Sequence, residues 1–117
     1  MPDRRVVVFL AHADEPSLRL AGSCALAAAA LGDRVDVYLF GPAVRAIVDA
    51  VDDGDPDEPA GLLAGQARGA GCRLVACSAS VVEQKVSLDH AERALDAVVG
   101  WPTILEWSRG VVDRYFF

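Results

Sequence analysis

Short apolar runs alternate along the chain with longer segments of helical pattern. Nearly continuous runs of β-branched and apolar residues occupy positions 5–11, 35–40 and 73–77, and such runs are typical of strands buried on both faces. Two weaker runs, at 97–99 and 111–117, predict a short fourth strand and a last strand. The pattern therefore predicts about five strands.

The segments between the first three runs have the pattern of helices. A carboxylate at Asp14 followed by Pro16 is a typical helix start, and an alanine-rich stretch follows over 17–31. Further helices are predicted at about 43–51 and at 60–70, the latter ending near a left-handed Gly71. The stretch between them, DDGDPDEP, is too rich in Asp, Gly and Pro for regular structure, so we expect a surface loop.

The part of the chain after the third run also contains helix starts. Ser80 and Glu83 fit a capping box, so a helix is predicted to begin just after Cys77. Asp89 with Glu92 marks a second start. A last helix is predicted from Pro102 and Thr103 through Trp107.

Strand and helix alternate with short connections throughout the chain. This order predicts an α/β fold, a parallel sheet with helices on both faces, in which chemistry lies beyond the carboxyl ends of the strands. The segments of interest are therefore 12–15, 41–44, 77–80 and 100–103. With 117 residues, the chain has room for a single domain, 1–117.

Composition narrows the class of function. Hydrophobic residues make up 53% of the chain and aromatic residues only 7%, which favours close packing of helices on the sheet over an aromatic ligand cavity. The net charge of -6 disfavours nucleic acid as a partner, although much of the acid lies in one run at 49–58. The apolar stretch 6–11 is too short for a signal peptide, and we see no membrane-spanning run. Three cysteines without a disulfide pattern fit a reducing compartment, so we expect a cytoplasmic protein.

Cys77 is the candidate for chemistry, because it ends a predicted buried strand just before a predicted helix. Backbone N–H groups and the dipole at a helix start stabilise a thiolate, and the hydroxyls of Ser78 and Ser80 add donors. His12 follows another strand and is a candidate base for the thiol, or else a polar loop residue. The alternative for Cys77 itself is a buried, inert thiol, since free cysteines are among the most buried residues.

The other two cysteines are not expected to join this chemistry. Cys24 lies inside the alanine-rich helix and is expected in the core. Cys72 and Cys77 lie five positions apart, which in a strand separates their α-carbons by roughly 16 Å. That separation exceeds the limit of roughly 7 Å for a disulfide. The two do not form a CxxC redox pair.

Several familiar motifs are missing from the sequence. The histidines and cysteines show no metal-ligand spacing. The glycines of GQARGAG precede a strand, whereas a dinucleotide-binding loop follows one, and neither a Walker A pattern nor a G-x-S-x-G elbow occurs.

Three stretches of the sequence resemble the DsrE/DsrF-like family, and together they cover almost the whole chain: VVVFLAHADEPSLRLAGSCALAAAALGDRVDVYLFGPAV, GAGCRLVACSAS and VVDRYFF. The resemblance implies a three-layer α/β/α sandwich around a mainly parallel sheet, assembled as a trimer or hexamer. In some relatives a cysteine at the end of the later strand, where Cys77 stands here, carries a persulfide for a sulfur relay.

Two functions follow from this resemblance. In the first, Cys77 receives sulfur from a persulfide donor protein and passes it to an acceptor, so that the chain is a sulfur carrier or sulfurtransferase subunit needing no metal or organic cofactor. In the second, the chain is a non-catalytic oligomeric module with a buried Cys77, with a small molecule at the strand ends as a further option. Trp101 and Trp107 have no counterpart in the family motif and either pack a helix onto the sheet or belong to a subunit interface.

Overall fold

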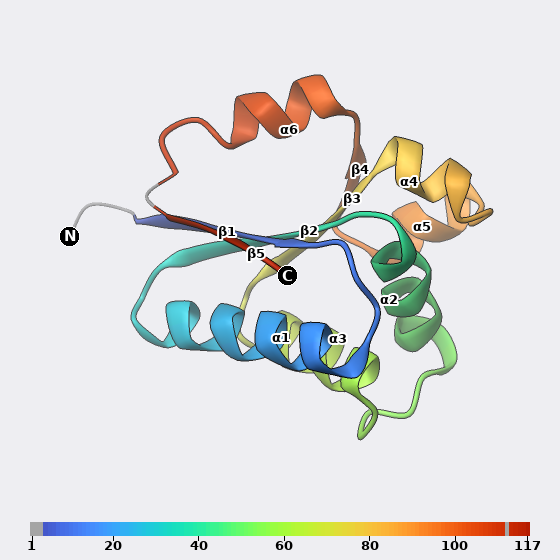
Figure 1. Cartoon of the computed structure of the whole chain (residues 1–117), viewed down its shortest axis with the longest axis horizontal. Helices are drawn as coiled ribbons and strands as arrows, with labels where there is room; N and C mark the ends of the chain where they lie inside the picture. The colour runs from blue at the N-terminus through green and yellow to red at the C-terminus, as the bar shows by residue number, and fades with distance from the viewer. Residues whose placement is uncertain (1–3, 112) are drawn as a thin grey trace.

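The computed structural model describes residues 4–111 and 113–117, which form a five-stranded sheet with helices on both faces (Figure 1). In chain order the elements are β1 (Arg5–Leu10), α1 (Glu15–Ala30), β2 (Arg34–Leu39), α2 (Pro42–Asp53), α3 (Pro59–Gly69), β3 (Arg73–Cys77), α4 (Ser78–Glu83), α5 (Leu88–Ala94), β4 (Ala97–Val99), α6 (Trp101–Trp107) and β5 (Asp113–Phe116).

All neighbouring strands of the sheet are parallel, in the order β4-β3-β2-β1-β5. The predicted α/β class and parallel sheet are thus confirmed. The first four strands are added in one direction, and β5 is then placed on the other side of β1. The topological switch point of the sheet, where ligands of such folds bind, therefore lies between β1 and β5.

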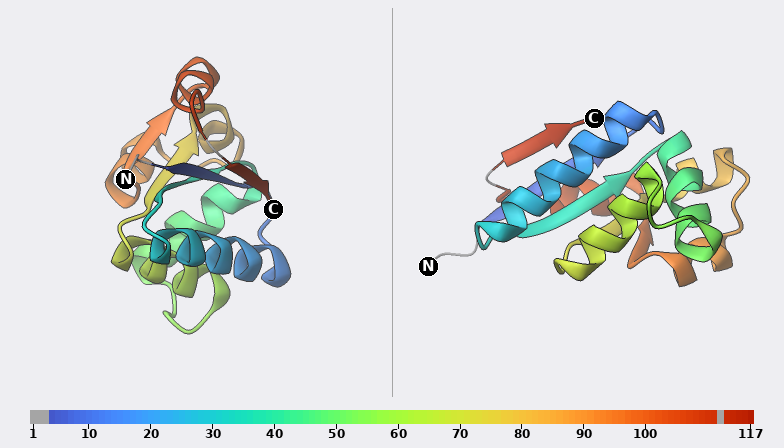
Figure 2. Two further views of the ribbon diagram at one scale, coloured as in Figure 1. Left: turned by 90° about the vertical axis from the view of Figure 1, so that its left-hand side faces the viewer. Right: turned by 90° about the horizontal axis from the view of Figure 1, so that it is seen from below.

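The two faces of the sheet are covered unequally. On one face, valines and leucines of the strands form the larger core with alanine-rich helix surfaces of α1, α2 and α3. On the other face, within the described part of the chain, α6 is the one helix, and it covers a smaller cluster that contains Tyr38, Val75, Cys77 and Ile104 (Figures 1 and 2). Small alanine side chains allow the first helix layer to pack closely, whereas the second layer leaves Phe9 and Phe40 half-buried and Phe116 exposed.

Most predicted elements lie within one or two residues of the observed ones. The third and fourth strands have the predicted bounds, and Gly71 has the expected left-handed conformation, with φ +82. The last strand was predicted over 111–117 and is observed over Asp113–Phe116, with position 112 outside the described residues. None of the helices in the described segments is long and apolar enough to cross a membrane.

The predicted capping box is wrong, although the predicted helix does begin just after Cys77. Helix α4 begins at Ser78, its cap residue is Cys77, and no side chain caps it. The Ser80 hydroxyl is instead bonded to Gly41, so tertiary contact overrides the local capping motif. Helix α5 begins at Leu88, one residue before the predicted start at Asp89, and it is capped by Ser87, whose hydroxyl accepts from the His90 amide at 3.1 Å.

Lys85 ends the α4 turn in a left-handed conformation, with φ 57. A side chain in this region strains the backbone, which glycine does not. We expect Lys85→Gly to raise the free energy of unfolding by about 0.5–1 kcal/mol, after the greater chain entropy of glycine is allowed for. Urea denaturation measures the change, with Lys85→Ala as the control that keeps the strain. Equal stability of the two variants would contradict the expectation.

Candidate functional site

Cys77 is the last residue of β3, at the carboxyl edge of the sheet as predicted, but its side chain is only 2% exposed. It belongs to the small cluster under α6, together with Val75, Tyr38 and Ile104. Within the described segments, no hydrogen bond to the Cys77 sulfur is formed. The thiol is thus covered by the helix layer above it.

Helix α6, which covers Cys77, is held mainly at its carboxyl end. Arg5 donates through Nη2 to the Trp107 carbonyl at 2.6 Å, and Arg114 donates to the Ser108 carbonyl at 2.8 Å. The Arg73 guanidinium lies 4.7 Å from the centre of the Trp107 ring. These contacts fix the carboxyl end of α6 over the amino ends of the strands.

Ser78 and Ser80, the predicted helpers of the thiol, lie in α4. Ser78 is half-buried, and its hydroxyl faces Gly100, at 3.6 Å from where a Cβ of that glycine would stand. Ser80 is buried, and its hydroxyl accepts a hydrogen bond from the Gly41 amide at 2.9 Å. Ser80 therefore joins α4 to the turn after β2 instead of supporting Cys77.

The Ser80 contact supports an unusual turn. Gly41 has φ 53 and ψ -139, a conformation open essentially to glycine alone, and its amide is satisfied by Ser80. We expect Ser80→Ala to lower the free energy of unfolding by about 1–2 kcal/mol, because it leaves the part-buried Gly41 amide without its partner. Thermal unfolding measures this loss. The neighbouring Ser78→Ala is the control, and a similar loss in both variants would contradict the assignment.

His12 follows β1 and is exposed. In the sheet, β2 separates β1 from β3, which carries Cys77, and the His12 ring lines a hollow of which Cys77 is not part. The structure describes no hydrogen bond between the two residues. The base role of His12 toward Cys77 stays a prediction, and its observed place points to a different site.

That hollow lies at the carboxyl ends of β1, β2 and β5, on the side of the sheet that α6 covers only in part. Its volume is about 560 Å³, and its lining is almost wholly apolar. The lining residues are Phe9, Ala11, His12, Phe40, Trp101, Phe116 and Phe117. All four phenylalanines of the chain and one of its two tryptophans thus gather around one space. The expectation that so few aromatic residues leave no aromatic cavity is wrong, because they are concentrated at one point.

Four of these aromatic rings form a row with nearly parallel planes. Phe116 and Phe9 have centroids 4.7 Å apart at 7°, Phe9 and Phe40 are 5.9 Å apart at 22°, and Phe40 and Trp101 are 5.2 Å apart at 22°. Phe116 and Phe9 are also direct partners across the β5 and β1 strands. The row therefore spans the sheet from its edge strand to the start of α6, over the switch point.

The phenylalanines were missed because each one, taken alone, is an ordinary apolar residue of a predicted strand. Phe9 and Phe116 read as ordinary apolar strand positions, and Phe40 as the end of the second strand. The signal that was available is positional, since phenylalanines stand within the last three positions of three predicted strands, on the edge where α/β folds bind ligands. If the strand order had been known, with β1 between β2 and β5, these aromatic residues would have been predicted to lie side by side.

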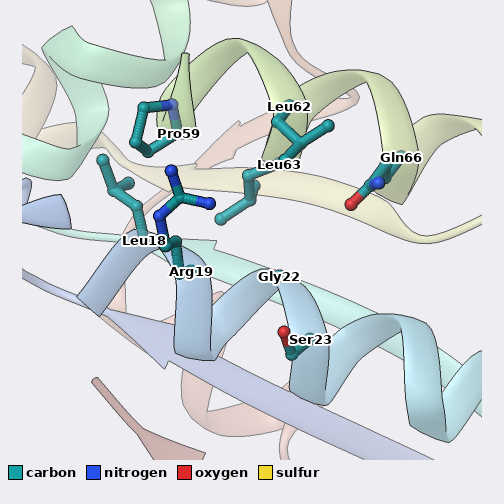
Figure 3. Close-up of a pocket in the computed structure, with 8 residues that line it drawn as sticks. All are labelled: Leu18, Arg19, Gly22, Ser23, Pro59, Leu62, Leu63 and Gln66. Atoms are coloured by element: carbon teal, nitrogen blue, oxygen red, sulfur yellow. The ribbon is translucent and has the colours of Figure 1, made fainter. Parts of the chain in front are cut away.

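A second hollow, of about 150 Å³, lies between α1 and α3 (Figure 3). Its polar side chains, Arg19, Ser23 and Gln66, are exposed, and Arg19 is paired with Glu15 at 2.8 Å. Gly22 faces Leu63 across this contact, where an added Cβ would stand at an ordinary packing distance of 3.6 Å. We interpret this groove as a consequence of helix packing.

The remaining cysteines lie on the other side of the sheet from α6. Cys72 is buried and Cys24 half-buried, and burial raises the pKa of both thiols. Both are therefore protonated near neutral pH and poor nucleophiles. Among residues 4–111 and 113–117 no group of three or more His, Cys, Asp or Glu side chains is placed to hold a metal ion.

Comparisons with known proteins identify the fold. No protein-family model matches the sequence, and no curated protein matches it either. Among solved structures, the ychN protein from E. coli is similar over 97% of this chain and 99% of its own, with 14% identity and a TM-score of 0.69. A conserved protein of unknown function from Bacteroides thetaiotaomicron, BT1422, is similar over 97% of this chain and 94% of its own, with 12% identity and a TM-score of 0.72. The chain therefore has the three-layer α/β fold of the ychN protein.

Proposed function

We propose that this chain is a non-catalytic, oligomeric module that binds a small, largely apolar molecule in the aromatic hollow at the carboxyl ends of its strands. The observation that carries the proposal is the position of this hollow at the switch point between β1 and β5. Ligands of open α/β sheets bind in this position, whatever the reaction or signal they serve.

The size and lining of the hollow support a ligand of this kind. Small-molecule sites typically enclose 300–1,000 Å³ and are lined by apolar and aromatic groups with a few polar ones. The hollow here has about 560 Å³ and one polar side chain, His12. The buried state of Cys77 supports a binding role over thiol chemistry, because a nucleophile must reach its substrate.

The proposal is tested with 2-naphthol, a flat and uncharged probe, and a thermal melt. A ligand that binds only the folded chain raises its melting temperature with concentration. We expect this rise in the wild-type chain and its loss in Phe116→Ala, which removes an exposed wall of the hollow. Leu105→Ala, which removes an exposed apolar side chain of α6 outside the lining, is the matched control. Absence of any rise, or a rise kept in Phe116→Ala, would overturn the proposal.

A second candidate function is persulfide carriage on Cys77. It is favoured by the place of the thiol at the end of β3, directly before α4, and by a cover made of one short helix. The Cys77 thiolate would attack the outer sulfur of a donor persulfide. The sulfur–sulfur bond of the donor then breaks, and the donor cysteine leaves as a thiolate. An acceptor thiolate would then take that same sulfur and release Cys77. No net oxidant is consumed in this transfer.

This second candidate has its own test. A small persulfide donor is added to the native protein, and its mass is measured. A gain of one sulfur in the wild-type chain that is lost in Cys77→Ser supports the relay. No gain, or a gain confined to Cys24 or Cys72, rejects it.

A further inference from the structure

We infer that the ligand of the hollow is a flat aromatic acid, whose ring extends the row of stacked side chains and whose carboxylate accepts a hydrogen bond from His12. The inference rests on the proposed function and names the class of ligand for the same site.

The row of rings favours a flat partner. Its members share one orientation to within 22° at each step, and both ends of the row lie open, with Phe116 72% and Trp101 50% exposed. An aromatic ligand gains offset stacking against such an exposed ring in addition to the burial of its surface. A saturated ring of similar size gains only the burial.

His12 supplies the polar contact. Its imidazole is exposed at the hollow, and within the described segments its ring makes no hydrogen bond. Asp14 interacts electrostatically with His12, but the pKa of Asp14 is lowered mainly by the hydrogen bond from the Ser17 amide. Asp14 also accepts from the Ser17 hydroxyl at 2.9 Å, so its oxygens serve the start of α1. The His12 N–H is left as the donor for an acceptor group on a ligand.

The negative net charge of the chain does not oppose an acidic ligand at this place. Six of the 17 acidic residues lie in the run 49–58, which contains no basic residue, so the other segments carry 11 of each sign. This run ends α2 and leads into α3, on the side of the sheet away from α6 (Figure 1). The aromatic row, in contrast, stands on the α6 side, and screening weakens the repulsion between exposed charges over such distances.

The class of ligand is tested by isothermal titration of the wild-type chain with four matched probes. They are 2-naphthoate, the neutral 2-naphthalenemethanol, the cationic 2-naphthylmethylamine, and decalin-2-carboxylate, which keeps the charge but is not flat. We expect 2-naphthoate to bind most tightly. His12→Ala should weaken 2-naphthoate about tenfold and leave the neutral probe nearly unchanged, while His12→Gln, which keeps an N–H donor, restores most of the affinity.

The outcomes separate this inference from the proposed function. If the neutral or cationic naphthalene binds as tightly as 2-naphthoate, or if His12→Ala weakens all probes equally, the inferred ligand class is wrong while the hollow stays a binding site. If decalin-2-carboxylate equals 2-naphthoate, the stacking argument is wrong. If none of the four binds, the proposed function itself fails.

Discussion

In the native protein, Cys77 should react with a thiol reagent at least about 100-fold more slowly than in the unfolded chain. The reason is that its side chain is 2% exposed and lies under α6, so labelling must wait for a local opening. An opening that costs about 3 kcal/mol slows labelling by that factor.

This labelling is measured in a Cys24→Ala, Cys72→Ala background, so that Cys77 is the one thiol left. A matched variant that keeps only Cys24, which is half-buried, gives the comparison and should react faster. Rapid labelling of Cys77 in the native chain would show an accessible thiol. That result would favour persulfide carriage over the binding function.

Ile104→Ala should lower the free energy of unfolding by about 2–4 kcal/mol, the largest loss expected from a single side chain of α6. All seven residues of α6 are described, and Ile104 is the one among them that is buried, at 1% exposure. Its removal leaves a cavity over Val75 and Cys77. The same variant should therefore label faster at Cys77.

The control for this variant is Leu105→Ala, on the same helix. Leu105 is 61% exposed, and its removal should change stability by less than about 0.5 kcal/mol. Urea denaturation gives both values. An equal loss in the two variants would mean that α6 is not held to the sheet as described.

The fold could be predicted from the sequence because the three central strands, β1, β2 and β3, are largely buried on both faces. Runs such as 73–77 have no other stable place than the middle of a parallel sheet, and the glycines and prolines between the runs mark the turns. The helix caps were less predictable, since the hydroxyl of Ser80 serves either its own helix or a distant amide. The structure shows that it bonds to Gly41, 39 positions away.

The candidate site could be predicted only in part. Strand-end residues such as Cys77 and His12 were identified from local pattern, but burial depends on what packs above them, and that is α6 from a later part of the chain. The gathering of the aromatic residues was also not predictable from local pattern, because it depends on the order of the strands in the sheet. Phe116 meets Phe9 because β5 returns to pair with β1, a long-range pairing that local pattern does not encode.

The central claim, a small-molecule site at the switch point, is tested most directly by mapping where 2-naphthoate binds with backbone amide NMR shifts. The account predicts that the largest shifts occur at His12 and at the neighbours of Phe9 and Phe116, with little change at Ser23 and Gln66 in the groove between α1 and α3. Shifts centred on that groove, or no shifts at a saturating concentration, would contradict it.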